Sequence, residues 1–126
     1  MKKIIALLFV LFIYSQNVEA NDLFVTNQLG AKLRELNDSE RYYDFLERLS
    51  GCYVDSVIVD SKADMIGLKK GDIITKINGV VVDSHSEVAN VLLKLKNGNF
   101  IKVDVLRNFV PRVFKWEFEN IERSEL

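Results

Sequence analysis

The sequence has 126 residues, of which 48% are hydrophobic and 28% charged, and its formal net charge is −1. These values predict one globular domain and argue against a disordered chain or a multi-span membrane protein. The 17 basic and 18 acidic residues form no basic stripe, so nucleic-acid binding is not expected. A single Cys and a single His exclude a disulfide framework within the chain and a Cys-rich zinc site. We therefore expect no metal site and no small-molecule cofactor.

The first twenty residues have the layout of a secretory signal peptide. Lys2 and Lys3 precede an apolar run over residues 4–14, and Val18-Glu19-Ala20 places short side chains before a cleavage position after Ala20. The alternative is a retained membrane anchor, but the run is shorter than the roughly 17–25 residues that span a bilayer. For a bacterial source, we expect cleavage after Ala20 and a periplasmic or secreted protein.

The next part of the chain predicts an apolar segment over 23–25, a polar loop over 26–28 and then a strand. Apolar side chains alternate from Leu29 to Leu33, which is typical of a half-buried strand. Asn37 and Glu40 have the spacing of a capping box and begin a predicted amphipathic helix of about three turns. Gly51 follows the last turn of this helix. Its apolar positions are Tyr42, Phe45, Leu46 and Leu49.

The middle of the chain predicts two strands, a short helix and a tight hairpin. Cys52 lies in an apolar stretch, where a Cys behaves as a small buried hydrophobic residue. Ile73 and Ile77 are predicted to share the core face of their strand. Asn78-Gly79 is the dipeptide that favours a two-residue hairpin turn. The predicted elements are a strand over 52–59, a helix over 62–66 that begins after Ser61 and ends before Gly67, a strand over 73–77 and a return strand over 80–82.

The last part predicts a second amphipathic helix and two alternating strands. Ser84 and Glu87 have capping-box spacing and open the helix, and Asn97-Gly98 closes it. The strands run over 101–105 and 114–118, on either side of a turn. The chain is thus an α+β domain with five or six short strands, two helices and one helical turn. Its predicted core is Val54, Ile58, Leu68, Ile73, Ile77, Val88, Leu92, Val103, Val105 and Trp116.

Residues 67–79 read Gly-Leu-Lys-Lys-Gly-Asp-Ile-Ile-Thr-Lys-Ile-Asn-Gly. This stretch closely resembles the Gly-Leu-x-x-Gly-Asp-x-Ile-x-x-Ile-Asn-Gly signature of PDZ domains. The order of elements is similar to that of the PDZ modules of HtrA-type periplasmic serine proteases and, more loosely, of type II secretion components. The resemblance implies a small, partly open β-barrel or sandwich in the permuted strand order of bacterial PDZ domains. The chain then divides into a signal peptide (1–20), a short segment (21–27), the PDZ-like domain (28–119) and a polar tail (120–126).

The resemblance also implies a peptide-binding site. Gln28-Leu29-Gly30-Ala31 matches the family's carboxylate-binding loop, in which successive backbone N–H groups form a nest for an anion. The strand that follows offers an edge to which an extended peptide can add. Gln28 replaces the family's usual apolar residue and Ala31 makes a shallow pocket, so we expect modest affinity. The groove-lining candidates are Leu33, His85, Val88 and Leu92, and a solvent-exposed position in the first helical turn is the alternative for His85.

No catalytic residues are expected, because the chain has one His and contains neither Gly-x-Ser-x-Gly nor His-Glu-x-x-His. The sequence instead predicts a stand-alone exported PDZ domain that binds extended C-terminal peptides of partner proteins. It would act as an adaptor or regulator in the cell envelope, with an envelope protease or a secretion component as candidate partner. The alternative is a structural interaction domain that docks a partner through its surface and leaves the groove empty.

Overall fold

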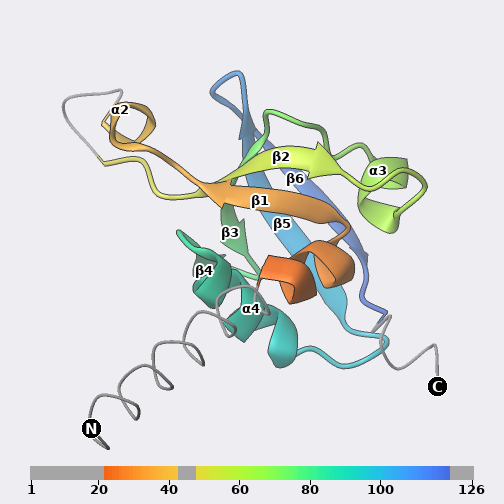
Figure 1. The fold of residues 1–126 in the computed structure, drawn as a ribbon. Helices are drawn as coiled ribbons and strands as arrows, with labels where there is room; N and C mark the ends of the chain where they lie inside the picture. The colour runs from red at the N-terminus through yellow and green to blue at the C-terminus, as the bar shows by residue number, and fades with distance from the viewer. Residues whose placement is uncertain (1–21, 43–47, 120–126) are drawn as a thin grey trace, which may run out of the picture.

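The structure, a computed structural model, describes residues 22–42 and 48–119 (Figure 1). The predicted signal peptide and the predicted polar tail lie outside this part of the chain. The described residues form one six-stranded antiparallel sheet and four helices, in the sheet order β1-β2-β3-β5-β6 with β4 paired to β3. The elements are a helix over 22–29, β1 (Ala31–Glu35), α2 (Asp38–Arg41), β2 (Cys52–Val57), α3 (Lys62–Ile66), β3 (Ile73–Ile77), β4 (Val80–Val81), α4 (His85–Leu93), β5 (Phe100–Arg107) and β6 (Val110–Glu117).

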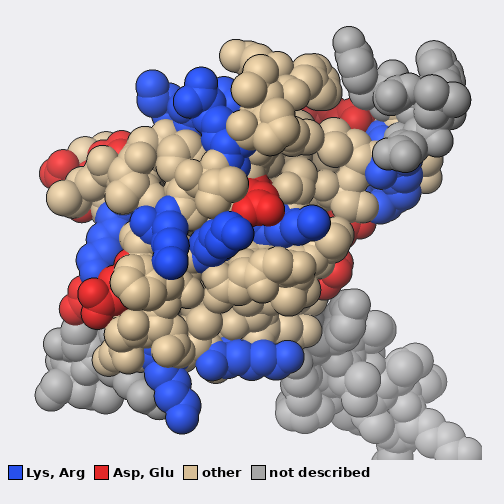
Figure 2. Space-filling model, turned by 180° about the vertical axis from the view of Figure 1, so that it is seen from behind, with Lys and Arg blue, Asp and Glu red and all other residues tan. Residues whose placement is uncertain are grey.

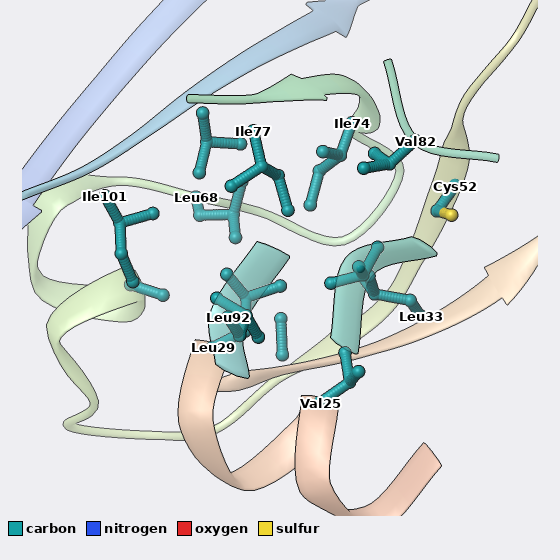
Figure 3. Packing of buried hydrophobic residues seen from close by; sticks show 14 of the residues in the cluster. Val25, Leu29, Leu33, Cys52, Leu68, Ile74, Ile77, Val82, Leu92 and Ile101 are labelled. Atoms are coloured by element: carbon teal, nitrogen blue, oxygen red, sulfur yellow. The ribbon is translucent and has the colours of Figure 1, made fainter. Parts of the chain in front are cut away.

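The sheet curves around a single core. Figure 1 shows β1 and β2 crossing in front of β5 and β6, while α4 and helix 22–29 lie at the open side between them. Both helices and the two halves of the sheet contribute to one buried cluster, part of which is drawn in Figure 3. Its largest fully buried side chains are Val25, Leu29, Leu33, Val54, Leu68, Ile74, Ile77, Val82, Val88, Leu92, Ile101 and Val103.

The predicted core is confirmed at every position except Ile58 and Ile73. Ile58 lies beyond the end of β2 and is 42% exposed. Ile73 is half-buried, and its neighbour Ile74 takes the core position. The pairing of β3 with β5 shifts register between Ile74 and Lys76. This β-bulge brings Ile74 and Ile77 to the same face although they are three residues apart, an arrangement that strict alternation excludes.

Residues 22–29 form a helix, so the prediction of an apolar segment followed by a loop is wrong. Val25 and Leu29 are four residues apart, lie on one helical face and are fully buried. The Thr26 hydroxyl donates a hydrogen bond to the Asp22 carbonyl within the first turn. Gly30 ends the helix in the left-handed conformation at φ +84°, and its N–H donates to the Thr26 carbonyl. Three of the four apolar residues of this segment are consecutive (residues 23–25), so they show no helical periodicity that a sequence pattern could detect.

The capping box at the start of α2 is confirmed, but the long helix predicted after it is not. The side chain of Asn37 accepts from the Glu40 N–H, and the Glu40 carboxylate accepts from the Asn37 N–H. The helix ends at Arg41, and residues 48–50 are not helical. The Arg41 carbonyl accepts from the Leu49 N–H, so the chain folds back here. Phe45 and Leu46 lie outside the described residues.

The short elements in the middle of the chain are confirmed. Ser61 caps α3, accepting a hydrogen bond from the Asp64 N–H. Asn78 and Gly79 both have positive φ, as a type I′ hairpin turn requires. Cys52 is buried in β2 between β1 and β3, and this burial raises the pKa of its thiol to about 12. The sequence prediction of a buried Cys52 is therefore confirmed.

A buried ion pair ties the turn before β3 to the end of β5. Asp72 is 1% exposed, and its two carboxylate oxygens accept from Nε and Nη2 of Arg107 at 2.7 and 2.8 Å. Nη2 of Arg107 also donates to the Gly67 carbonyl, and the Lys69 N–H donates to Asp72. The hydrogen bond to Asp72 raises the pKa of Arg107 above its ordinary value. The Asp72 carboxylate thus stabilises its own turn and also binds Arg107, which lies 35 residues later in the chain.

Removing the Arg107 side chain should therefore destabilise the domain strongly. Arg107→Ala leaves the Asp72 carboxylate buried without its cation, and we expect the free energy of unfolding to fall by about 3–5 kcal/mol. Lys62→Ala is the control, because the Lys62–Glu119 pair at 3.6 Å is formed by two largely exposed side chains. Its loss should cost no more than about 1 kcal/mol. Urea denaturation measures both variants, and equal losses would contradict a structural role for the buried pair.

Candidate functional site

The candidate site is the free edge of β1, which faces α4. β1 is the terminal strand of the sheet and pairs only with β2 among the described strands. The Leu33 carbonyl accepts a hydrogen bond from His85 Nε2 of α4 at 2.7 Å. This bond shows that the carbonyl points away from β2 and toward α4. Backbone groups alternate in direction along a strand, so Ala31, Leu33 and Glu35 present their N–H and C=O groups to this edge. An extended peptide would find its main-chain partners here.

The predicted groove-lining side chains come together, but they do not line an open groove. Leu33 of β1 and Val88 and Leu92 of α4 are all fully buried. Val25 of helix 22–29 belongs to the same cluster and is 0% exposed. Figure 3 shows Val25 and Leu29 reaching from helix 22–29 toward Leu33 and the α4 side chains. In this structure the apolar wall of the groove is covered from within the chain.

His85 connects three elements of the site. Besides its bond to the Leu33 carbonyl of β1, Nε2 lies 3.2 Å from Oδ1 of Asp22 in helix 22–29. Because the Leu33 carbonyl can only accept, the ring must carry its proton on Nε2. The side chain is 25% exposed and hydrogen-bonded to β1, so this residue of the first helical turn is only partly solvent-exposed. The Ser84 hydroxyl caps the same turn by accepting from the Glu87 N–H.

The predicted carboxylate-binding loop is buried and its central donor is occupied. All four residues of Gln28-Leu29-Gly30-Ala31 are buried. The Gly30 N–H, the donor at the centre of the expected nest, bonds to the Thr26 carbonyl at the end of helix 22–29. The Gly30 carbonyl accepts from the Ile58 N–H. The structure therefore positions the loop at the mouth of the site, but the loop is folded as the end of a helix.

A cavity of about 280 Å³ lies beside this loop. Among the described residues that line it, Lys62 alone is basic, whereas Asp60, Glu117 and Glu119 are acidic. A carboxylate would be repelled there, so the cavity is a poor carboxylate site. The remaining lining residues are Asn27, Gln28, Leu29, Gly30, Ile58, Val59, Ser61 and Trp116.

Asp83 holds the start of α4 against the end of β1. Its carboxylate accepts hydrogen bonds from Arg41 of α2, from Arg48 Nη2 at 2.7 Å and from the Gly51 N–H at 3.1 Å. Burial raises the pKa of Asp83, but these three hydrogen bonds outweigh burial and lower the pKa to about 2. Arg41 in turn donates through Nε to the Leu36 carbonyl just after β1. Sequence reasoning missed this cluster because its partners lie 32–42 residues from Asp83 in the chain.

Residues 27–115 match the sequence profile of the PDZ domain. This chain belongs to the PDZ domain family. The PDZ domain is 46% identical over 63 residues to serine protease HTRA1 of Xenopus laevis, covering 50% of this chain and 13% of that protein. It is 31% identical over 83 residues to the periplasmic pH-dependent serine endoprotease DegQ of Escherichia coli, covering 66% of this chain and 18% of that protein. The chain thus spans less than a fifth of the length of these relatives.

Solved structures give the same family and fold. The HtrA-type protease AlgW with a decapeptide matches with a TM-score of 0.59 at 26% identity, over 71% of this chain and 27% of that one. The HtrA3 PDZ domain bound to the phage-derived ligand FGRWV matches with a TM-score of 0.50 at 28% identity, over 68% of this chain and 85% of that one. These findings confirm the resemblance predicted from residues 67–79.

A PDZ domain is a binding module and not a catalytic one. Within the described part of the PDZ domain, no group of acidic, Cys and His side chains is arranged to hold a metal ion. Nor does any helix among the described residues have the length and apolarity needed to cross a bilayer.

The Asp83 cluster should make the stability of this PDZ domain fall at acid pH. A lowered pKa means that the ionised carboxylate stabilises the fold above its ordinary pKa of 3.8, and that this contribution is lost as the pH falls toward about 2. Asp83→Asn should flatten the dependence of the melting temperature on pH in that window. The melting temperature should still depend weakly on pH in this variant, because the hydrogen bond from Arg34 lowers the pKa of the Glu40 carboxyl to about 2 as well. Parallel pH profiles for variant and wild type would contradict this assignment.

Gly30 should tolerate no side chain, for two separable reasons. Its φ of +84° is strained for any other residue, and a Cβ would lie 2.8 Å from Ser61 Oγ and 2.9 Å from Ser61 Cβ. Gly79 has a similar φ of +79° but open space around it. We expect Gly79→Ala to lower the free energy of unfolding by about 1 kcal/mol and Gly30→Ala by about 2–4 kcal/mol. Denaturant titration measures both, and equal losses would show that contact with Ser61 has no role.

Proposed function

We propose that this PDZ domain binds extended peptides with a free carboxyl terminus, by adding them as a strand between β1 and α4. The observation that carries the proposal is the free edge of β1, whose outward Leu33 carbonyl has a side chain and not a strand as its partner. The match to an HtrA3 PDZ domain bound to the peptide FGRWV and to AlgW with a decapeptide supports it.

Each part of the site has a role in this mode of binding. The N–H groups of the peptide donate to the β1 edge, and alternate side chains of the peptide face the domain. The backbone of Leu29-Gly30-Ala31 receives the terminal carboxylate, while Val88 and Leu92 form an apolar wall for the last side chain. Few residues are engaged and the peptide is ordered on binding, so the dissociation constant should be on the order of micromolar.

We further propose that the protein is exported and acts in the cell envelope as an adaptor or regulator. The signal-peptide layout of residues 1–20 and the similarity to periplasmic proteases support this location. Its partners would be protein C-termini, those of an envelope protease or a secretion component among them. No cofactor and no catalytic residue enter this function.

A second candidate function is docking through the surface with the groove unused. The burial of Leu33, Val88 and Leu92, in one cluster with Val25 of helix 22–29, favours it. Figure 2 shows a band of Lys and Arg side chains across the face opposite to that seen in Figure 1, with acidic atoms among them. Lys102 of β5 also pairs in register with Lys115 of β6, so two positively charged side chains lie side by side on these strands. An acidic partner surface would fit this band.

Amidation of the peptide separates the two functions. We expect heptapeptides selected from a random library with free carboxyl termini to bind, and their C-terminal amides to bind at least about tenfold more weakly, because the nest holds an anion. Calorimetric titration measures the two affinities. Backbone amide shifts in NMR spectra should move along β1 and α4, with the β5–β6 turn as the internal control. Equal binding of acid and amide, with shifts confined to the β5–β6 face, would assign the function to surface docking.

A further inference from the structure

Helix 22–29 lies where a peptide would have to enter. The helix is adjacent to α4 and to the start of β1 (Figure 1), and its Val25 is fully buried in the cluster that contains Leu33 and Leu92. Any peptide side chain directed at this apolar wall would meet Val25. The apolar part of the groove therefore already has an occupant, supplied by the same chain.

The main-chain edge is occupied as well. The Leu33 carbonyl, which would accept from a peptide N–H, accepts from His85 Nε2 at 2.7 Å. The same nitrogen lies 3.2 Å from Asp22 Oδ1 at the beginning of helix 22–29. His85 thus joins the β1 edge to the helix that covers the groove, and its ring lies on the side from which a peptide N–H would approach the Leu33 carbonyl.

The carboxylate loop is the third occupied part. The Gly30 N–H cannot donate to a peptide carboxylate while it donates to the Thr26 carbonyl at the end of helix 22–29. One N–H group serves one strong acceptor at a time, so the helix end and the anion nest are alternative uses of this donor. The apolar wall, the strand edge and the nest are all taken by the same short segment and by the residue that contacts it.

We propose that helix 22–29 is a built-in cover of the peptide groove, and that a peptide binds this PDZ domain only after the helix is displaced. The inference rests on the proposed peptide-binding function and adds a regulatory step to it. The helix is short enough to be marginal in isolation, so it depends on the packing of Val25 and Leu29. Only molecules in which the helix is displaced can bind a peptide. The apparent affinity is therefore the intrinsic affinity multiplied by the fraction of molecules in this open state. A partner or a modification that removes the helix would raise that affinity.

The first test compares the same substitution on the two faces of helix 22–29. Val25→Asp places a charge in the buried face and should release the helix, whereas Leu23→Asp changes a side chain that is 63% exposed. With heptapeptides selected as above on each variant, Val25→Asp should bind about tenfold or more tightly than wild type, and Leu23→Asp should bind as wild type does. Near-ultraviolet circular dichroism verifies that the sheet around Trp116 stays folded.

The second test holds the helix closed and needs no destabilising substitution in the core. Asp22→Cys and His85→Cys are introduced together and bridged with a bismaleimide reagent that contains a reducible disulfide. Cys52 should not react, because it is buried and its pKa is about 12. The bridged protein should lose at least about tenfold in affinity for the selected heptapeptide, and reduction of the linker should restore it.

The outcomes separate the inference from the function on which it rests. Weaker binding in the bridged form together with tighter binding in Val25→Asp supports the cover. Equal affinities in the bridged, reduced, Val25→Asp and wild-type proteins would overturn the cover and leave peptide binding intact. No binding of any heptapeptide by any of the forms would overturn both.

Discussion

The unpaired edge of β1 is the constraint on which the site depends. A strand at the border of a sheet leaves N–H and C=O groups that need partners, and unmet groups at an exposed edge invite pairing with another chain. In this PDZ domain the edge is protected by α4, His85 and helix 22–29. The Asp83 cluster fixes α4 in this role by joining its start to α2 and to the residue before β2. The arrangement that protects the β1 edge from random strand pairing would also, on the proposed function, control which partner can pair with it.

The covered groove suggests how such a domain can combine a promiscuous binding mode with control. Backbone hydrogen bonds to an edge strand carry little sequence information, because every peptide presents the same main chain. A segment that competes for the groove adds a threshold, since only ligands whose contacts exceed those of Val25 and the Gly30 N–H can displace it. On the proposed mechanism, weak ligands would be excluded by competition with the helix and not by a closer fit of the pocket.

The fold could be predicted from local signals, whereas the state of the site could not. The 67–79 signature, the Ser61 and Ser84 caps and the Asn78-Gly79 turn are local patterns, and the structure confirms them. The bulge at Thr75 depends on how β3 registers against β5, which no pattern within β3 reveals.

The candidate site shows more clearly what sequence patterns could not predict. The groove-lining candidates lie in the elements predicted for them, β1 and α4, but they are buried in a cluster that also contains Val25 and Leu29 of helix 22–29. The sequence of that helix carries only two core positions and contains no capping box. The Asp83 cluster and the second bond of Asp72 likewise join positions that are more than thirty residues apart. Long-range pairs of this kind are decided by packing of the whole domain.

The burial of the Cys52 thiol makes its reactivity differ between the folded and the unfolded protein. β1 and β3 flank it on both sides, and its high pKa leaves almost no thiolate to react. In an oxidising compartment the native domain is therefore inert, while a chain that has lost β1 exposes a sulfur able to form mixed disulfides. The rate at which a thiol reagent modifies Cys52 consequently reports how often the sheet around it opens.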